Sequence, residues 1–299
     1  MKGYLKAAAA VGCILVFFAV SSPVSGAAKL TPASSAPSAT KTPGGVLGEI
    51  SSMLGQSEPL VSGIQAIVSW ELESSQTSSG ESSSQAEDSS QAAVDAAELK
   101  AKHDELKGYV TGLDGLKTQA GALPAAGTDS VKKTVAAAQE YFARLSGASD
   151  DLLTVYEYGM ALEDALTPMV EWNAPDDGTD ASALADSLSQ VIAKCQDNMA
   201  ALKSPDYLAD TQKDLEDQLA VFQKFCEDFA VAAELGDPLR LTSDMQRLAR
   251  LQIQLGICSD NLNQDIDLQF TQTQKRLGGS TGKLHDELKA NIAVLTGGK

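Results

Sequence analysis

The sequence predicts an all-α fold, an up-and-down bundle of at least four long antiparallel helices in residues 92–299. Apolar residues in this part recur at spacings of three, four and seven, the period of a helix that buries one face. Turns that contain Gly or Pro separate the helical stretches, and no segment after the N-terminal apolar run alternates between apolar and polar residues with a period of two. These observations together are typical of a helical bundle with coiled-coil-like packing.

Residues 1–27 are expected to form a signal peptide or membrane anchor. Two lysines precede the apolar run Ala7–Val20, and small residues follow it, so we expect cleavage after Gly26 or Ala27. The run is shorter than the roughly 20 residues of a membrane span. An uncleaved anchor, which would tether the chain to a membrane, and a lipoprotein acylated at Cys13 are the alternatives. Each predicts an extracytoplasmic protein, either secreted or membrane-anchored.

Residues 28–91 are expected to be a low-complexity, flexible region. Residues 31–45 are rich in Pro, Ser, Ala and Thr, and Ser74–Ser90 contains nine serines in seventeen positions. Neither stretch can bury enough apolar area to offset the entropy lost on ordering. Helical spacing of apolar residues predicts a short amphipathic helix near 60–73 between them, and Val46–Leu54 is a candidate for another. This helix would either dock loosely or bind a partner or the groove of the bundle.

The bundle is expected to begin with a helix whose apolar positions include Leu99, Leu106 and Leu116 and which several glycines weaken. A long helix should follow from Asp129 to about Trp172. A polar turn, which contains the acidic residues 176–180, then precedes a helix with an apolar stripe from residue 184 to residue 202. We expect the acidic turn to supply N-cap residues, since it lacks the spacing of a calcium-binding loop.

Two further helices have readable starts. Ser204-Pro205-Asp206 places a proline at the first helical position, and Gly236-Asp237-Pro238 ends one helix and starts the next. Gly278-Gly279 should break that last helix before a terminal one at residues 284–295. In architecture alone, this arrangement resembles the helical domains of bacterial envelope proteins and lipoproteins of unknown function, and no specific motif accompanies the likeness.

Three cysteines, Cys195, Cys226 and Cys258, remain after the apolar run, and all lie on apolar stripes, so they are expected to be buried thiols. Counting residues across each turn places Cys195 level with about residue 214, and residue 214 level with about residue 259. Cys226 is then roughly 18 Å from that level at 1.5 Å per residue, too far for a bridge. If a disulfide forms, we therefore expect it to join Cys195 to Cys258.

The sequence offers no catalytic constellation. It lacks the metal, nucleophile-elbow and phosphate-loop motifs that we searched for, and no cofactor or metal ligand set is predicted. Both of its histidines occur in a repeated word, His103-Asp104-Glu105-Leu106-Lys107 and residues 285–289. The two words are consistent with a diverged duplication or with chance convergence, and we expect both to lie on solvated faces. The formal net charge of −17 argues against nucleic acid as a partner.

These observations favour a non-enzymatic, extracytoplasmic helical bundle on a flexible stalk. It would act as an interaction or structural module whose partner is a protein of the envelope or cell surface. The alternative is a ligand-binding or sensory bundle that holds a small apolar molecule or a cation between its helices.

Overall fold

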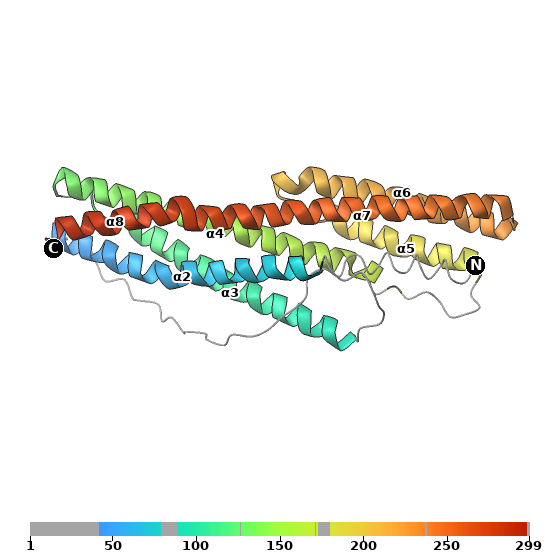
Figure 1. Ribbon diagram of the computed structural model, residues 1–299, viewed down its shortest axis with the longest axis horizontal. Coiled ribbons are helices and arrows are strands. Elements are labelled where there is room, and N and C mark those ends of the chain that lie inside the picture. Colours follow the sequence, from blue (N-terminus) through green and yellow to red (C-terminus); the bar gives the residue numbers. More distant parts are fainter. Residues whose placement is uncertain are drawn as a thin grey trace. The chain divides into compact units, whose positions relative to one another are not determined.

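The computed structural model describes residues 42–78, 89–125, 127–170, 172, 180–236 and 238–297. Every regular element in these ranges is helical, in agreement with the predicted all-α class (Figure 1). None of the described helices has both the length and the hydropathy that a membrane span requires. The predicted signal segment lies outside the described residues, as does most of the serine-rich stretch.

The described helices fall into two compact units. The α2–α3 unit contains α2 (Pro43–Ser78), α3 (Ser89–Gly121), the first part of α4 (Asp129–Val170) and the chain from Phe270 onward. The α5–α6 unit runs from Thr154 to Gln269. The division falls inside two long helices, α4 and α7, so each of these helices contributes residues to both units.

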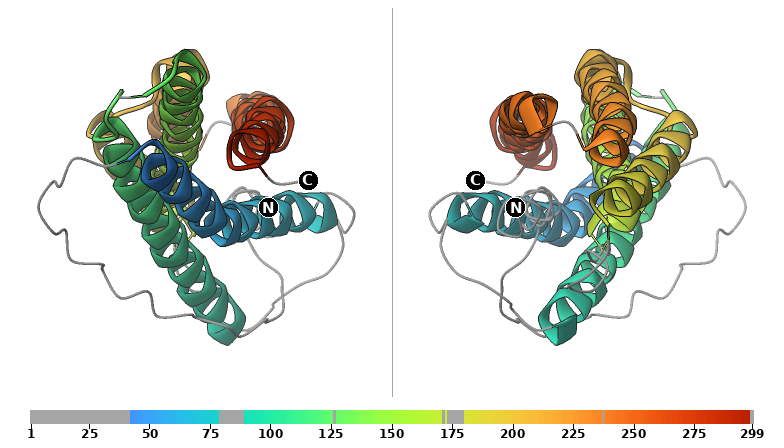
Figure 2. Two further views of the ribbon diagram at one scale, coloured as in Figure 1. Left: turned by 90° about the vertical axis from the view of Figure 1, so that its left-hand side faces the viewer. Right: turned by 90° about the vertical axis from the view of Figure 1, so that its right-hand side faces the viewer.

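Helix α2 differs from the expectation of a short helix near 60–73. It extends over Pro43–Ser78 and buries apolar side chains from its first turns, including Val46, Ile50 and Leu54. It packs against α3, and Figure 2 shows the two helices crossing. The apolar period of residues 46–54 therefore belongs to the same helix as that of residues 60–68, and this helix is part of the fold.

Two glycines bring α2 and α3 close together where they cross. A Cβ atom placed on Gly63 would lie 2.3 Å from Cζ of Tyr109, and one on Gly112 would lie 3.0 Å from a methyl group of Leu60. Ordinary contacts of this kind are longer than 3.4 Å. Gly112 was expected only to weaken the first bundle helix. In the structure it provides room for the Leu60 side chain of the neighbouring helix.

The predicted long helix is confirmed as α4. The loop before it contains Gly127 at φ 106°, a backbone conformation that favours glycine, and the Thr128 hydroxyl accepts a hydrogen bond from the Val131 amide at 3.4 Å. The helix contains Pro168 near its end at Val170. A proline there removes one backbone donor in the last turn, where the helix ends shortly afterwards.

The α5–α6 unit shows most of the predicted caps. The Asp180 carboxylate accepts a hydrogen bond from the Ser182 amide and caps α5 (Ala181–Ala200), as the acidic turn predicted. A 3-10 turn, η2 (Asp206–Leu208), comes before α6 (Ala209–Leu235), so the helix starts later than the proline at 205 suggested. Gly236 adopts φ 63° and ends α6, and α7 (Pro238–Lys275) follows as expected.

The two glycines at 278 and 279 do not break the last helix. The chain passes from α7 through a π-helical turn, η3 (Arg276–Ser280), directly into α8 (Thr281–Leu295). The Arg276 carbonyl accepts the backbone N–H of Thr281, as in a π-helical turn, and also the Thr281 hydroxyl at 2.6 Å. The prediction of a break was wrong because the glycine pair is accommodated by one wider turn.

Candidate functional site

The described residues contain no group of three or more His, Cys, Asp or Glu side chains arranged to hold a metal ion. The features that could bind a ligand or a partner are cavities, buried polar clusters and exposed apolar surface. Each of the features below lies within one unit.

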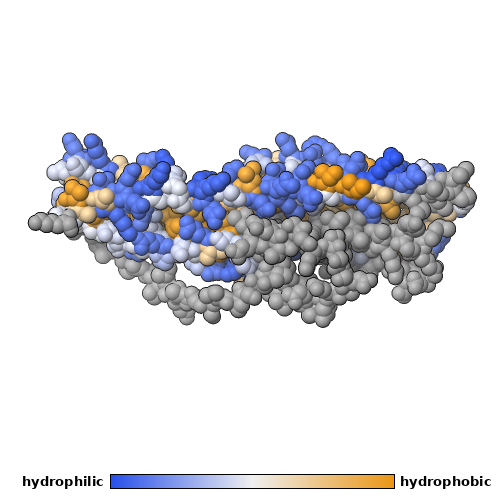
Figure 3. All heavy atoms as spheres, in the orientation of Figure 1, coloured by the Kyte–Doolittle hydropathy of each residue, from blue (hydrophilic) through white to orange (hydrophobic). Residues whose placement is uncertain are grey.

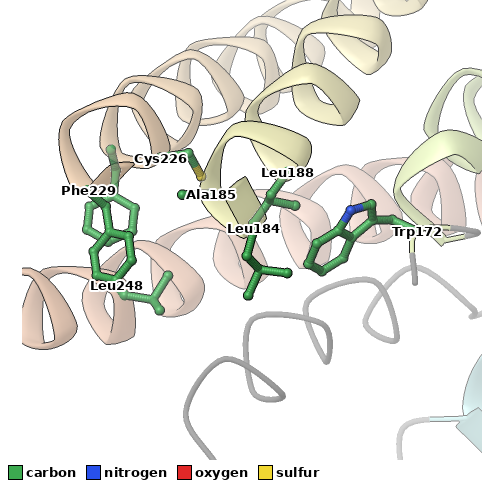
Figure 4. Close-up of a pocket in the computed structure, with 8 residues that line it drawn as sticks. Trp172, Leu184, Ala185, Leu188, Cys226, Phe229 and Leu248 are labelled. Atoms are coloured by element: carbon green, nitrogen blue, oxygen red, sulfur yellow. The ribbon is translucent and has the colours of Figure 1, made fainter. Parts of the chain in front are cut away.

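An apolar pocket lies between α5, α6 and α7 in the α5–α6 unit. Its volume is about 30 Å³, and Figure 4 shows Leu184 and Leu188 beside the ring of Trp172, with Phe229 and Leu248 together. The remaining lining residues are Ala185, Phe225 and Cys226. Ligand pockets in proteins measure hundreds of Å³, so a ligand would have to displace side chains to enter. The lining of this pocket is apolar, as expected for a site that binds a small apolar molecule, but its volume is too small to hold one without rearrangement.

Polar groups lie at the edges of this pocket. The Trp172 indole donates to the Ser187 hydroxyl at 3.1 Å, which leaves the rest of the ring free to line the pocket. The Arg247 guanidinium lies 5.6 Å from the centroid of the Phe225 ring and 3.5 Å from the Asp228 carboxylate. The hydrogen bond from Lys224 makes the largest contribution to lowering the pKa of the Asp228 carboxyl. The positive charge of Lys224 and the contact with Arg247 lower this pKa further.

The three cysteines are free thiols in this structure, so no bond joins Cys195 to Cys258. Cys195 is buried on α5, and its sulfur lies 3.9 Å from the Leu166 carbonyl of α4. Cys258 is partly exposed on α7 near Asp214 of α6. The pairing itself stays a prediction, and in this structure one thiol faces α4 while the other lies near α6.

Burial raises the pKa of each thiol. The effect is largest at Cys226, whose pKa rises to about 12 because burial disfavours the thiolate and Glu227 adds negative charge. Burial also raises the pKa of Cys195 and Cys258, and the charge of Asp214 adds to the effect at Cys258. A raised pKa lowers the thiolate fraction, which makes all three poor nucleophiles at neutral pH.

The repeated histidine words are not on fully solvated faces, contrary to the expectation. The side chains of His103 and His285 are only 15% and 16% exposed. In both words, Nδ1 of the histidine lies near the carboxylate of the next aspartate, at 3.5 Å for Asp104 and 3.3 Å for Asp286. The two copies thus share a local geometry that sequence spacing alone did not reveal.

His285 also takes part in the contact between α8 and α2. Its Nε2 lies 3.3 Å from a carboxylate oxygen of Glu58, and its ring tilts against Tyr141 with a centroid separation of 5.8 Å. Lys289 forms an ion pair with the same carboxylate. The Lys289 hydrogen bond and charge lower the pKa of Glu58. This cluster attaches the terminal helix to α2, and the sequence could not indicate it because the partners are 231 residues apart.

Exposed large apolar side chains occur on α6, α7 and α8, and α7 carries two of them one helical turn apart. Ile253 and Ile257, one helical turn apart, are 65% and 53% exposed, and Leu268 is 49% exposed. Figure 3 shows hydrophobic patches over this helix within a largely hydrophilic surface. Single exposed apolar residues are normal, but neighbouring ones on one helical face indicate an interaction surface. Helical spacing places positions 253 and 257 on the side of α7 opposite the buried Leu251, Leu255 and Leu262, so the sequence alone could have indicated this exposure.

Comparisons with protein-family models, with curated proteins and with solved structures return no match to this chain. The class that the structure defines is an all-helical protein with packed helices.

Proposed function

We propose that this chain is a non-enzymatic, extracytoplasmic helical-bundle protein that acts as an interaction or structural module of the cell envelope. The observation that carries the proposal is the adjacent pair Ile253 and Ile257 on the outer side of α7. The export signal expected in residues 1–27 supports the location.

The energetics favour covering this pair. Complete burial of an isoleucine side chain contributes about 1.5–3 kcal/mol. Since Ile253 and Ile257 are 65% and 53% exposed, a partner that covers both could gain roughly 2–3 kcal/mol from them. That is enough for one or two powers of ten in affinity, and polar contacts around the pair would supply specificity.

Photo-crosslinking in cells tests the interaction. A photoreactive amino acid at position 253 should produce protein adducts, whereas the same group at Val294 on α8 should produce few. Val294 is a suitable control because it is 77% exposed and lies in the other unit. Equal or absent adducts at the two positions would contradict the proposed interaction role.

The location has a separate test. A reporter enzyme that is active only after export is fused to the C-terminus of the full chain and to a variant without residues 2–27. We expect activity only from the full chain. Equal activity from both fusions, or none from the full chain, would overturn the proposed export.

The apolar pocket favours a second candidate, a ligand-binding or sensory bundle. A ligand present at 100 times its Kd would stabilise the chain by about 2.7 kcal/mol, which a thermal scan with a panel of apolar molecules detects. Ala185→Leu places extra methyl groups in the pocket and should abolish any shift. A shift that survives this substitution would exclude the pocket as the binding site.

A further inference from the structure

Six exposed residues of α7 between positions 246 and 264 lie on one face of the helix. They follow one another at spacings of four, three, four, three and four, which is the spacing of a coiled-coil seam, and four more residues of this stretch are exposed beside them: Arg247, Ala249, Gln254 and Asn261. We call this set the α7 outer seam, and every member of it is exposed: Gln246, Arg250, Ile253, Ile257, Asp260 and Gln264. Helix α7 has a separate inner seam, which includes the buried Leu251, Leu255 and Leu262. A helix with two seams can pack on its own unit and on a second helix at the same time.

The outer seam is complementary to itself when reversed. The midpoint of the outer seam along the chain is position 255, although Leu255 itself belongs to the inner seam. Ile253 and Ile257 lie two residues from this midpoint on either side. Arg250 and Asp260 are also equally far from the centre. If a second α7 lies antiparallel with its centre opposite the first, each isoleucine faces the other isoleucine of the partner. Each arginine then faces an aspartate, so the contact contains two ion pairs related by a twofold axis.

The alternative orientation is unfavourable. In a parallel pair, like positions face each other, so Arg250 would lie against Arg250 and Asp260 against Asp260. Like charges at such positions are destabilising, and they therefore select the antiparallel arrangement. The next residues outward also match, since Gln246 faces Gln264, and the side chains of two amides can bond to each other. The small Ala249, which is exposed beside the seam, leaves room for close approach.

We propose that two copies of this chain associate through the α7 outer seam, in an antiparallel twofold contact. This inference deepens the proposed function by naming a second copy as the partner of the same surface. The seam covers 19 residues, about 27 Å of helix at 1.5 Å per residue. At the roughly 10 Å width of one helix, this strip is less than half of the about 800 Å² that a standard interface buries per partner. The dimer is therefore reversible and depends on concentration.

Charge reversal tests the pairing. Arg250→Glu places a glutamate opposite Asp260 at both ends of the contact, and Asp260→Arg places an arginine opposite Arg250. Each single variant should weaken dimerisation at least tenfold in sedimentation velocity of the full chain, from micromolar to millimolar concentration. The double variant reverses both charges and should restore the dimer with the net charge of the original chain. Controls are Lys133→Glu and Asp186→Arg, which make the same charge changes at exposed positions outside the seam and should leave dimerisation unchanged.

Cysteine crosslinking tests the register independently. In the antiparallel pair, Arg250→Cys combined with Asp260→Cys brings two thiols of different copies together, and mild oxidation should yield a covalent dimer. Within one copy these positions are about 15 Å apart along the helix and cannot be bridged. Arg250→Cys alone should yield little dimer, whereas a parallel contact would crosslink it. Far-UV circular dichroism and the melting temperature of each variant establish that it folds.

Three outcomes would overturn the self-association. They are a monomer at all concentrations, a double charge variant that stays monomeric although it folds, and efficient crosslinking of Arg250→Cys alone. These outcomes are separable from failure of the proposed function. If position 253 crosslinks to a different protein while the chain sediments as a monomer, the interaction role stands and the second copy is excluded as the partner. If position 253 gives no adduct and the chain is monomeric, both fail.

Discussion

The close approach of α2 and α3 at Gly63 can be tested by a double-mutant cycle. Replacing a glycine inside a helix by alanine normally stabilises the helix by about 1 kcal/mol. At Gly63 the added methyl group would lie 2.3 Å from Cζ and 2.7 Å from the hydroxyl oxygen of Tyr109. The tyrosine ring therefore has to move away, and it is the flexible end of a side chain, so it moves before the helices separate.

The size of the effect follows from what Tyr109 loses. Overpacking typically costs about 1–3 kcal/mol. A displaced ring would also lose the hydrogen bond that the Tyr109 phenol donates to Glu105 at 2.7 Å. We expect Gly63→Ala to be neutral or destabilising by up to about 2 kcal/mol when Tyr109 is present. In a Tyr109→Ala background the same change should stabilise by about 1 kcal/mol. The coupling energy between the two sites is then about 1–3 kcal/mol, within the range of residues in contact.

Urea denaturation of the four proteins in the cycle measures this coupling. Gly115→Ala is the matched control, because nothing lies within 4 Å of its added Cβ and it should stabilise by about 1 kcal/mol in both backgrounds. If Gly63→Ala stabilises equally with and without Tyr109, the described crossing of α2 and α3 is wrong.

The same contact has a titration signature. The hydrogen bond to Glu105, together with burial and the charge of Glu105, raises the pKa of Tyr109 to about 12. Because the folded state favours the protonated phenol, its contribution to stability is present below the ordinary pKa of 10.0 and is lost as pH rises through about 12. Ultraviolet titration of Gly63→Ala should show this tyrosine ionising closer to its ordinary value. An unchanged ionisation would mean that the ring keeps its place.

Three further outcomes are expected elsewhere in the chain. Under native conditions a maleimide should modify the partly exposed Cys258 faster than the buried Cys226, as mass spectrometry of digests can show, and the reverse order would contradict the described burial. Glu58→Gln should cost less than about 1 kcal/mol, because the ion pair with Lys289 is half exposed. Since the pKa of Glu58 is lowered, that contribution is present above the ordinary carboxyl pKa and is lost as pH falls through the folded value, so the variant and the original chain should converge in acid denaturation. Gly236→Ala should destabilise by about 1 kcal/mol in thermal unfolding, because alanine is strained at φ 63°.

Local patterns in the sequence were sufficient for the fold class and most helix ends. A period of three to four residues reports which face of a helix is buried, and it predicted α4 from Asp129 onward. Caps are also local, so the carboxylate of Asp180 and the left-handed Gly236 could be read before any tertiary contact was known. The limits of local evidence appear at Gly278-Gly279, where composition suggested a break and the chain forms a wider turn instead.

Only the tertiary structure decided what packs against what. Because low-complexity segments flank α2, the sequence did not indicate that α2 belongs to the fold. The close contact between Gly63 of α2 and the Tyr109 ring of α3 shows that it does. The environment of His285 depends on Glu58, which is far away in sequence, so its burial could not follow from the repeated word. Periodicity and caps depend on residues within a few turns of one another and are therefore written into the sequence itself. Partners between helices depend on how the chain returns on itself, and that geometry exists only once the helices pack.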